Sequence, residues 1–282
     1  MSKPASDKVV RVLVVEDDPH ARDVMCMLLV RDWRTKVVAE AASLVELKRF
    51  LKSRRRERVD LMLIDVEHPH QADWAFELTA AAQAIMPKTL VLFTSTHPNE
   101  IALRQALRLT NCQGYILNSE VLYALAGVVW EAAQGRWVTT RGVRALAQKQ
   151  ILTLPPSTLV LDGGQTFNKL SPRQRDVARL ALLFNLRHAE IADELNITVG
   201  QVNKYVSAVY QILDVPGFLD GSNDAGQSFE AAQLLNRFRD ARLKARTVKK
   251  AEGEFMAGPE KTTLAFHLLT MPIALTQEDL LD

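Results

Sequence analysis

The sequence predicts an α/β doubly wound sheet of five parallel strands, followed by an all-α helix-turn-helix domain with a helical C-terminal extension. Three observations support this fold class. Short apolar runs alternate with helical patterns in the first half, as in parallel strands joined by helices. The stretch 170–213 divides into three amphipathic helices. Another amphipathic pattern follows it, beyond residue 215.

The bulk properties limit the class of protein. The chain has 282 residues, of which 48% are hydrophobic, which is enough for two ordinary domains with buried cores. No apolar run reaches membrane-spanning length, and the first residues lack the apolar segment of a secretory signal. We therefore expect a cytoplasmic protein without a membrane partner. The net charge of +2 is too small to indicate nucleic-acid binding by itself, so local charge must carry that argument.

Residues 1–8 are predicted to be an N-terminal tail. The domain predicted over residues 9–134 follows it and contains five strand patterns. The predicted strands cover 9–15, 36–40, 60–65, 89–94 and 114–117, and the predicted helices lie near 19–31, 43–54, 72–85, 98–109 and 119–134. Ligands of such sheets collect outside the carboxyl ends of the strands. Acids stand at these ends, because Glu16 and Asp17 follow the first run and Asp65 closes the third.

These acids converge if the first and third strands are neighbours. Converged carboxylates repel one another unless a hard divalent cation such as Mg²⁺ joins them. One carboxylate can then attack a phosphoryl group, with Thr94 at the end of the fourth strand bonding the transferred oxygens. The alternative is that the acids only cap the following helices, as Asp18 is placed to do.

Residues 9–134 resemble the CheY-like receiver domain of bacterial response regulators. VLVVEDDP matches the first strand and acid pair, here Glu16 and Asp17, and DLMLIDVEHP matches the strand that ends in the phospho-accepting Asp65. Thr94 matches the hydroxyl residue and Tyr115 the aromatic switch position. The resemblance implies an Mg²⁺ site formed by Glu16, Asp17 and Asp65, and phosphorylation by a sensor histidine kinase.

One position departs from the receiver pattern. The family has a Lys after the fifth strand, where this chain has Asn118. Asn donates a hydrogen bond but brings no charge, and a charge-assisted bond is roughly twice as strong. Two alternatives therefore stay open: Asp65 is a phosphoacceptor that controls the C-terminal domain, or the receiver is degenerate and acts without phosphate.

Residues 135–169 are predicted to be a linker. Residues 139–150 fit a short helix, and the breakers Pro155–Pro156 and Gly163–Gly164 favour a hinge over 151–169.

The domain predicted over 170–215 begins with a capping box, in which Ser171 and Gln174 bond each other's backbone. The first helix then presents an apolar face that includes Val177 and Phe184. A second capping box, Thr198 with Gln201, opens the third helix. There the face of Val202, Val206, Val209 and Leu213 leaves a polar flank of Gln201, Asn203, Lys204, Ser207 and Gln211.

Such a flank suits a DNA major groove, although an ordinary solvated helix face is the alternative. LSPRQRDV and AEIADELNITVGQVNKYVS resemble the DNA-binding domain of LuxR/NarL-type regulators. The resemblance implies a helix near 199–213 that contacts double-stranded DNA, in a homodimer. Arg187 stands where that family usually has a Ser cap.

The extension over 216–282 contains two patterns. Residues 228–247 are predicted to form an amphipathic helix with a basic face, which suits either DNA phosphates or packing and dimerisation. The apolar stretch 262–276 suits a docking strand or helix.

Together these features predict a DNA-binding transcriptional regulator of the response-regulator type, not an enzyme. One alternative is a protein-interaction adaptor with a degenerate receiver. Another is an Mg²⁺-dependent phosphohydrolase, which the absence of an Asp-x-Asp pair after the first strand disfavours.

Overall fold

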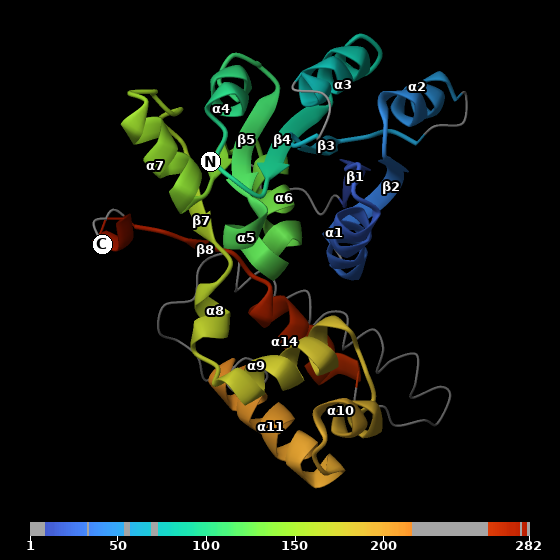
Figure 1. Ribbon diagram of the computed structural model, residues 1–282, viewed down its shortest axis with the longest axis vertical. Coiled ribbons are helices and arrows are strands. Elements are labelled where there is room, and N and C mark those ends of the chain that lie inside the picture. The colour runs from blue at the N-terminus through green and yellow to red at the C-terminus, as the bar shows by residue number, and fades with distance from the viewer. Residues whose placement is uncertain are drawn as a thin grey trace, which may run out of the picture. The chain divides into compact units, whose positions relative to one another are not determined.

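The computed structural model describes residues 9–32, 34–53, 57–68, 73–215, 259–276 and 278–280 (Figure 1). The chain forms two compact units, one of residues 1–165 with 270–282 and one of residues 166–269. The predicted N-terminal tail 1–8 and the predicted basic helix 228–247 lie outside the described residues.

The first unit is built on one sheet. Among the described residues it has eight strands in the order β2-β1-β3-β4-β5-β6-β7-β8. The strands are β1 (Val10–Val15), β2 (Thr35–Ala41), β3 (Leu61–Asp65), β4 (Leu90–Ser95), β5 (Cys112–Leu117), β6 (Val138–Thr139), β7 (Leu159–Asp162) and β8 (Ile273–Ala274). All neighbours pair in parallel except β7 and β8, which are antiparallel. The predicted five-stranded parallel sheet is confirmed, and three short strands extend it.

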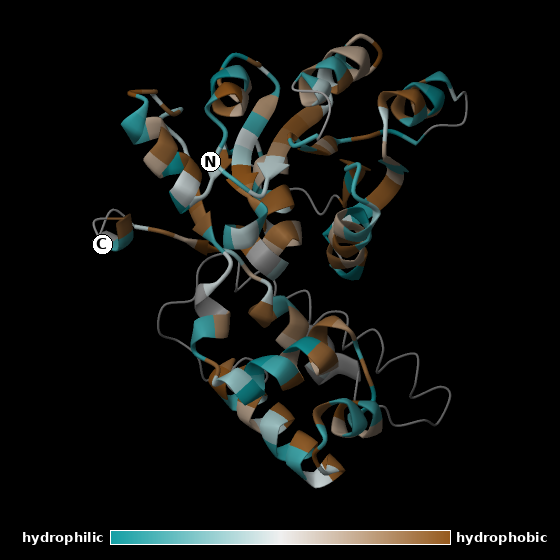
Figure 2. Ribbon diagram, in the orientation of Figure 1, coloured by the Kyte–Doolittle hydropathy of each residue, from teal (hydrophilic) through white to brown (hydrophobic). Residues whose placement is uncertain are grey.

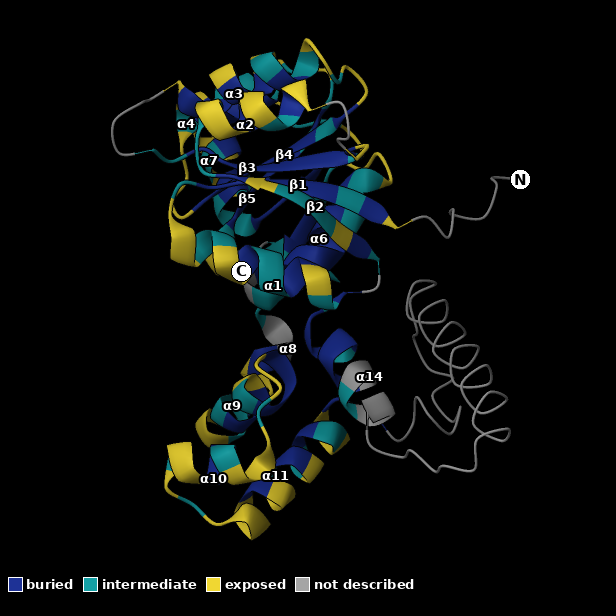
Figure 3. Ribbon diagram, turned by 90° about the vertical axis from the view of Figure 1, so that its right-hand side faces the viewer, coloured by how far each residue is buried: buried dark blue, intermediate teal, exposed yellow. Residues whose placement is uncertain are grey.

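Helices cover both faces of this sheet. They are α1 (Pro19–Arg31), α2 (Leu44–Lys52), α3 (Trp74–Gln83), α4 (Glu100–Ala106), α5 (Asn118–Val121), α6 (Leu125–Ala133) and α7 (Arg141–Lys149), with 3₁₀ turns at Leu122–Ala124 and Glu278–Leu280. The strands are mostly apolar and buried (Figures 2 and 3). Successive residues of a strand point to opposite faces. Leu13 and Val15 therefore join the core under α2, α3, α4 and α7, whereas Val12 and Val14 join the core under α1 and α6.

The linker predicted over 135–169 is wrong for most of its length. β6, α7 and β7 lie in the first unit, because Val138, Val143 and Val160 are buried against the sheet and its helices. β6 continues the sheet beyond β5 and approaches it closely. At Gly114, whose φ is +149°, an added Cβ would stand 2.1 Å from the carbonyl oxygen of Val138. Pro155–Pro156 lies in the loop between α7 and β7, inside this unit and not between the two units.

The C-terminal apolar stretch contributes to both units. Its first part is α14 (Pro259–Leu269) in the second unit, and its second part is β8 in the first. The amide of Leu275 donates to the carbonyl of Val160 at 2.8 Å. Pro272 leaves no room for a side chain at Gly127 of α6. Both predicted forms, a docking strand and a helix, are thus present in successive parts of the stretch.

The second unit is helical, as predicted. Besides α14 it contains α9 (Pro172–Ala178), α10 (His188–Leu195) and α11 (Val199–Ile212), and the unit boundary falls within α8 (Gln165–Asn168). Both predicted capping boxes are formed, by Ser171 with Gln174 and by Thr198 with Gln201.

Phe184 does not lie on the buried face predicted for it, because 53% of its surface is exposed. A π-helical turn, Arg179–Leu183, follows α9, and the amide of Phe184 bonds the carbonyl of Arg179 five residues earlier. The wider turn rotates later residues away from the face that a regular α-helix would give them. Asn185 then ends the segment with φ of +57°, the left-handed conformation that Asn tolerates.

None of the helices in the described ranges combines the length and the apolar character needed to cross a lipid bilayer.

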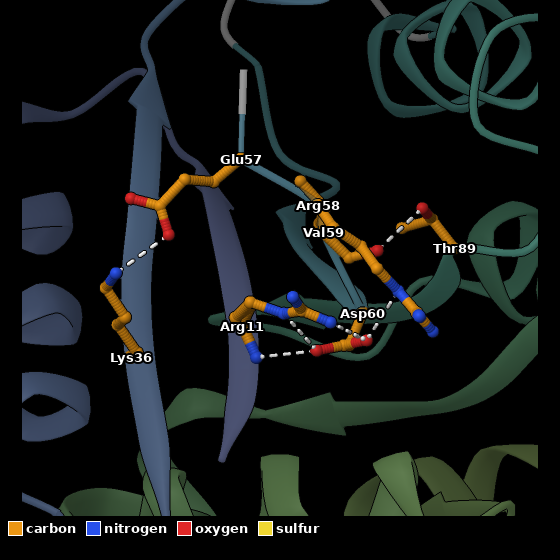
Figure 4. A network of polar contacts seen from close by, with 7 residues as sticks. All are labelled: Arg11, Lys36, Glu57, Arg58, Val59, Asp60 and Thr89. Carbon is orange, nitrogen blue, oxygen red and sulfur yellow. Dashed lines mark hydrogen bonds and ion pairs between the residues drawn. The ribbon is translucent and has the colours of Figure 1, made fainter. Parts of the chain in front are cut away.

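A polar network joins the amino ends of β1 and β3 (Figure 4). The Arg11 guanidinium donates two hydrogen bonds to the Asp60 carboxylate, at 2.8 and 3.0 Å, and Arg58 Nε lies 3.2 Å from the same carboxylate. The backbones of Arg11 and Asp60 are also bonded, at 2.9 Å. At the exposed side of the network Lys36 pairs with Glu57 at 2.7 Å. Asp60 therefore anchors the start of one central strand to the other.

Replacing Asp60 with Asn should lower the free energy of unfolding by about 1–3 kcal/mol, because hydrogen bonds between charged groups are lost at a largely covered site. Replacing Glu57 with Gln removes an exposed ion pair from the same network and should cost less than about 1 kcal/mol. Urea unfolding of both variants checks this difference. If both variants lost the same free energy of unfolding, the Arg11–Asp60 contact would stabilise the fold no more than the exposed ion pair does.

Candidate functional site

The carboxyl ends of β1, β3, β4 and β5 form a pocket lined by acids. β1 and β3 are neighbours, and Val15 pairs with Ile64, so Glu16 and Asp65 follow at adjacent positions. Both side chains are only 4% exposed. Asp17 and Asn118 line the same pocket. The predicted convergence of the acids is therefore present in the structure.

Backbone amides hold the two buried carboxylates in place. The amide of Asp18 donates to Glu16 Oε1 at 3.0 Å, and the amide of Glu67 donates to Asp65 Oδ1 at 2.6 Å. Trp74 Nε1 donates to the carbonyl of Asp65 at 2.9 Å. Asp18 itself caps α1, as the alternative for the acids expects, whereas Asp65 ends β3, and the next described helix, α3, has Asp73 at its N-cap position.

Asn118 connects Thr94 to Asp65. The Thr94 hydroxyl donates to Asn118 Oδ1, and Asn118 Nδ2 donates to Asp65 Oδ2 at 3.5 Å. Thr94 is fully buried at the end of β4. Asn118, which stands where the receiver pattern has a Lys, therefore faces the candidate phosphoacceptor and supplies a hydrogen-bond donor without charge.

The electrostatics of the pocket favour a proton or a cation. Burial is the main cause that raises the pKa of the Asp65 carboxyl, and the charge of Glu16 raises it further. Burial also raises the pKa of Glu16, with the neighbouring charge of Asp17 acting in the same direction. Because two carboxylates with raised pKa values share one pocket, a positive charge bound there would relieve their repulsion.

The predicted metal ligands are only partly brought together. Glu16, Asp17 and Asp65 all line the pocket. Within the described ranges, however, no three His, Cys, Asp or Glu side chains stand in an arrangement that could hold a metal ion.

Tyr115, the predicted switch residue, is fully buried on β5. Its hydroxyl lies 2.6 Å from Ser95 Oγ, accepts from the amide of Asn99 at 3.1 Å and donates to the carbonyl of His97 at 3.1 Å. The amide of His97 donates in turn to Glu67 Oε1 at 3.0 Å. A continuous path of polar contacts thus links Asp65, through Glu67 and His97, to Tyr115.

Ser95, His97 and Glu67 were not among the predicted site residues. A signal for them is present, because Ser95 is the last residue of β4, and Glu67 and His97 each come two residues after the end of a strand, β3 and β4 respectively.

The second candidate site is the exposed face of α11. Val202, Val206 and Val209 are buried, and the five predicted DNA-contacting residues are exposed, namely Gln201, Asn203, Lys204, Ser207 and Gln211. The helix therefore has one apolar and one polar side (Figures 2 and 3). Two of the five side chains already have partners. Gln201 Oε1 accepts from the amide of Thr198 at 2.9 Å, and Asn203 Oδ1 lies 2.5 Å from His188 Nδ1.

The turn between α10 and α11 is held at the carboxyl end of α10. Asn196, with φ of +51°, ends α10 in the left-handed conformation. Arg173 of α9 donates to the carbonyl of Leu195 at 2.9 Å.

The amino end of α10 carries Arg187, at the position where the LuxR/NarL pattern has a Ser cap. Arg187 pairs with Glu190, whose carboxylate also accepts from the Arg187 amide at 2.8 Å. The departure at Arg187 therefore leaves α10 with a capped amino end.

Comparison with known proteins bears on this second unit. Residues 164–211 match the family model of sigma-70, region 4, which is a helix-turn-helix family. The match covers α9, α10 and most of α11. A search of the curated proteins found no match.

Solved structures similar to this chain include two of the response regulator RcsB and one of a LuxR-family response regulator. One is the RcsB response regulator of Salmonella typhimurium, with 16% identity and a TM-score of 0.43 over 81% of this chain and 98% of that one. A complex of the two-component response regulator RcsB with DNA has 17% identity and a TM-score of 0.43, over 73% and 92%. A LuxR-family response regulator from Aurantimonas sp. SI85-9A1 has 21% identity and a TM-score of 0.43, over 51% and 99%.

The raised pKa of Asp65 makes a prediction about stability. A carboxyl whose pKa is raised by folding stabilises the fold fully below the unfolded-state pKa of about 4, and this contribution is lost as the pH rises through the folded value. Asp65→Asn, which cannot ionise, should therefore raise the free energy of unfolding more at about pH 8 than at about pH 5, by a difference on the order of 1–3 kcal/mol, and the melting temperature should rise accordingly.

Thermal unfolding at both pH values measures this difference. Glu194→Gln changes an exposed carboxylate of α10 in the same way and should leave the pH dependence of stability unaltered. An equal effect of Asp65→Asn at both pH values would contradict the prediction.

Proposed function

We propose that this chain is a DNA-binding transcriptional regulator of the response-regulator type, acting in the cytoplasm. The observation that carries the proposal is α11, which is anchored by three buried valines and exposes Asn203, Lys204 and Ser207. It lies in a segment that matches a helix-turn-helix family.

The exposed face of α11 has suitable chemistry for duplex DNA. Amide, hydroxyl and ammonium groups can bond base edges in the major groove, and a Lys can also neutralise a phosphate. Helix-turn-helix proteins commonly bind two half-sites as dimers, so we propose a second copy of this chain as a partner on DNA. One of the similar solved structures is itself a complex of RcsB with DNA.

The pocket of the first unit supports a phosphoacceptor role for Asp65. Its carboxylate oxygen would attack the phosphorus of a phosphohistidine on a sensor kinase, and the P–N bond would break to leave the imidazole. Asn118 lines this pocket and bonds Asp65, and Thr94 bonds Asn118, so both side chains are candidates for bonding the transferred oxygens. The path of polar contacts from Asp65 offers a route by which the change reaches Tyr115 on β5.

Glu16, Asp17 and Asp65 would hold Mg²⁺. Their chemistry suits a hard divalent cation, because all three are oxygen donors lining one pocket and burial raises the pKa of two of them, but the three carboxylates would have to move closer together to ligate it. A bound Mg²⁺ supplies charge neutralisation between these carboxylates and a phosphoryl group.

A specific observation favours a second candidate function, a regulator or adaptor that works without phosphorylation. Asn118 occupies the position of a cation and ties Thr94 to Asp65 through neutral hydrogen bonds. The acyl phosphate would then lack one charge-assisted bond. The two candidates differ in whether Asp65 becomes phosphorylated.

Incubation with Mg²⁺ and a small phosphodonor should give a labile acyl phosphate on Asp65, seen as a mass increase that Asp65→Asn lacks. Asn118→Lys should raise the phosphorylated fraction, because it restores a charge beside the transferred group. If the wild type shows no mass shift while a standard receiver reacts in parallel, the phosphoacceptor role of Asp65 is refuted, and the result supports a regulator or adaptor that works without phosphorylation.

Lys204→Ala should weaken retention of the full chain on promoter fragments by about fivefold or more at low salt, because it removes a contact to a base edge or a phosphate. Lys149→Ala removes the same charge from an exposed position on α7 and should have little effect. Fluorescence anisotropy over a salt series measures both. Lack of wild-type binding to any genomic fragment would refute the DNA-binding proposal.

A further inference from the structure

α10 and α11 meet through a polar side-chain contact at the surface of the second unit. His188 is the first residue of α10, and Asn203 lies in the second turn of α11. His188 Nδ1 and Asn203 Oδ1 are 2.5 Å apart, and both side chains are exposed. The contact therefore lies beside Lys204 on the proposed reading face, although neither apolar packing nor capping requires it.

The chemistry of this contact restricts both side chains. A carbonyl oxygen only accepts hydrogen bonds, so the imidazole donates and the proton stands on Nδ1. The Asn amide has one accepting oxygen and one amino group with two donors. When His188 donates to the Asn203 oxygen, the Asn203 amino group points away from α10. An amide without such a partner can turn by 180° and offer either end.

We propose that His188 is a positioning residue that determines which bases Asn203 reads. The proposal rests on the proposed DNA-binding function and adds a specificity element to it. An Asn203 held by its oxygen presents donors, which suit acceptors in the major groove such as guanine O6 and N7 or thymine O4. A freely turning Asn favours adenine, which it bonds through both ends.

The proposal separates His188 from residues that only contact phosphate. A phosphate contact strengthens binding to all sequences alike, because the backbone carries no direct sequence information. A positioning residue instead changes the preference at one base pair and leaves the others as they were. Preference at a single position is therefore the decisive readout.

The test selects duplexes from a randomised pool with the full-length wild type, His188→Ala, Asn203→Ala and the double variant. Asn203→Ala identifies the base pair that Asn203 reads. At that pair His188→Ala should lower the preference for the acceptor-bearing base by roughly three- to tenfold, the worth of one neutral hydrogen bond. The double variant should match Asn203→Ala, since the two residues act through one contact.

His20→Ala is a matched control, because His20 is an exposed histidine in the first turn of another helix, α1. It should leave every preference unchanged. A His188→Ala variant that weakens binding equally for all sequences, or that leaves the preference at the Asn203 base pair intact, overturns the proposal while the DNA-binding function stands. A wild type that selects no duplex overturns both.

A second measurement needs no substitution and no DNA. An ¹⁵N NMR spectrum of the DNA-free wild-type chain, with ¹⁵N-labelled histidines and at a pH where the imidazole is neutral, reports which ring nitrogen of His188 carries the proton. Protonated Nδ1 supports the proposal. Protonated Nε2, with Nδ1 bare, overturns it, because a bare Nδ1 cannot donate to the Asn203 oxygen.

Discussion

The parallel pairing of β1 with β3 is the constraint on which the first unit depends. It sends alternate residues of each strand into two separate cores, so that helices are needed on both faces. The same register ends both strands at one level, which places Glu16 and Asp65 together. At the opposite end, Arg11 and Asp60 tie the two strands by side chain and backbone. The fold and the acidic pocket thus have one structural origin.

The pocket combines low exposure with carboxylate repulsion. Desolvation raises the free energy of each charge, and the second charge raises it again. Such a site responds strongly to any group that changes its net charge, whether a proton, a cation or a phosphoryl group. The polar path through Glu67 and His97 connects this site to the fully buried hydroxyl of Tyr115.

The sheet continues past the strands that carry the pocket. β6 and β7 extend it in parallel, and β8 comes from the end of the chain after α14, which belongs to the helical unit. The chain therefore passes between the two units twice, once within α8 and once after Leu269. In the helical unit the hydroxyl of Tyr210 on α11 also lies 3.2 Å from that of Thr262 on α14, so α14 contacts the helix that carries the proposed DNA-binding face.

Local signals in the sequence determined much of this protein. Apolar runs with alternating faces located the five central strands, both capping boxes located helix starts, and the stripe of valines oriented α11, because each signal acts within a few residues. Tertiary structure alone decided the rest. β6, β7 and β8 are too short to be recognised without the neighbour that buries them. Phe184 is exposed because a π-helical turn changes the register of its helix. His188 and Asn203 are 15 residues apart in the chain, and they meet because the turn between α10 and α11 brings these two helices together. No spacing of residues within one helix encodes this contact.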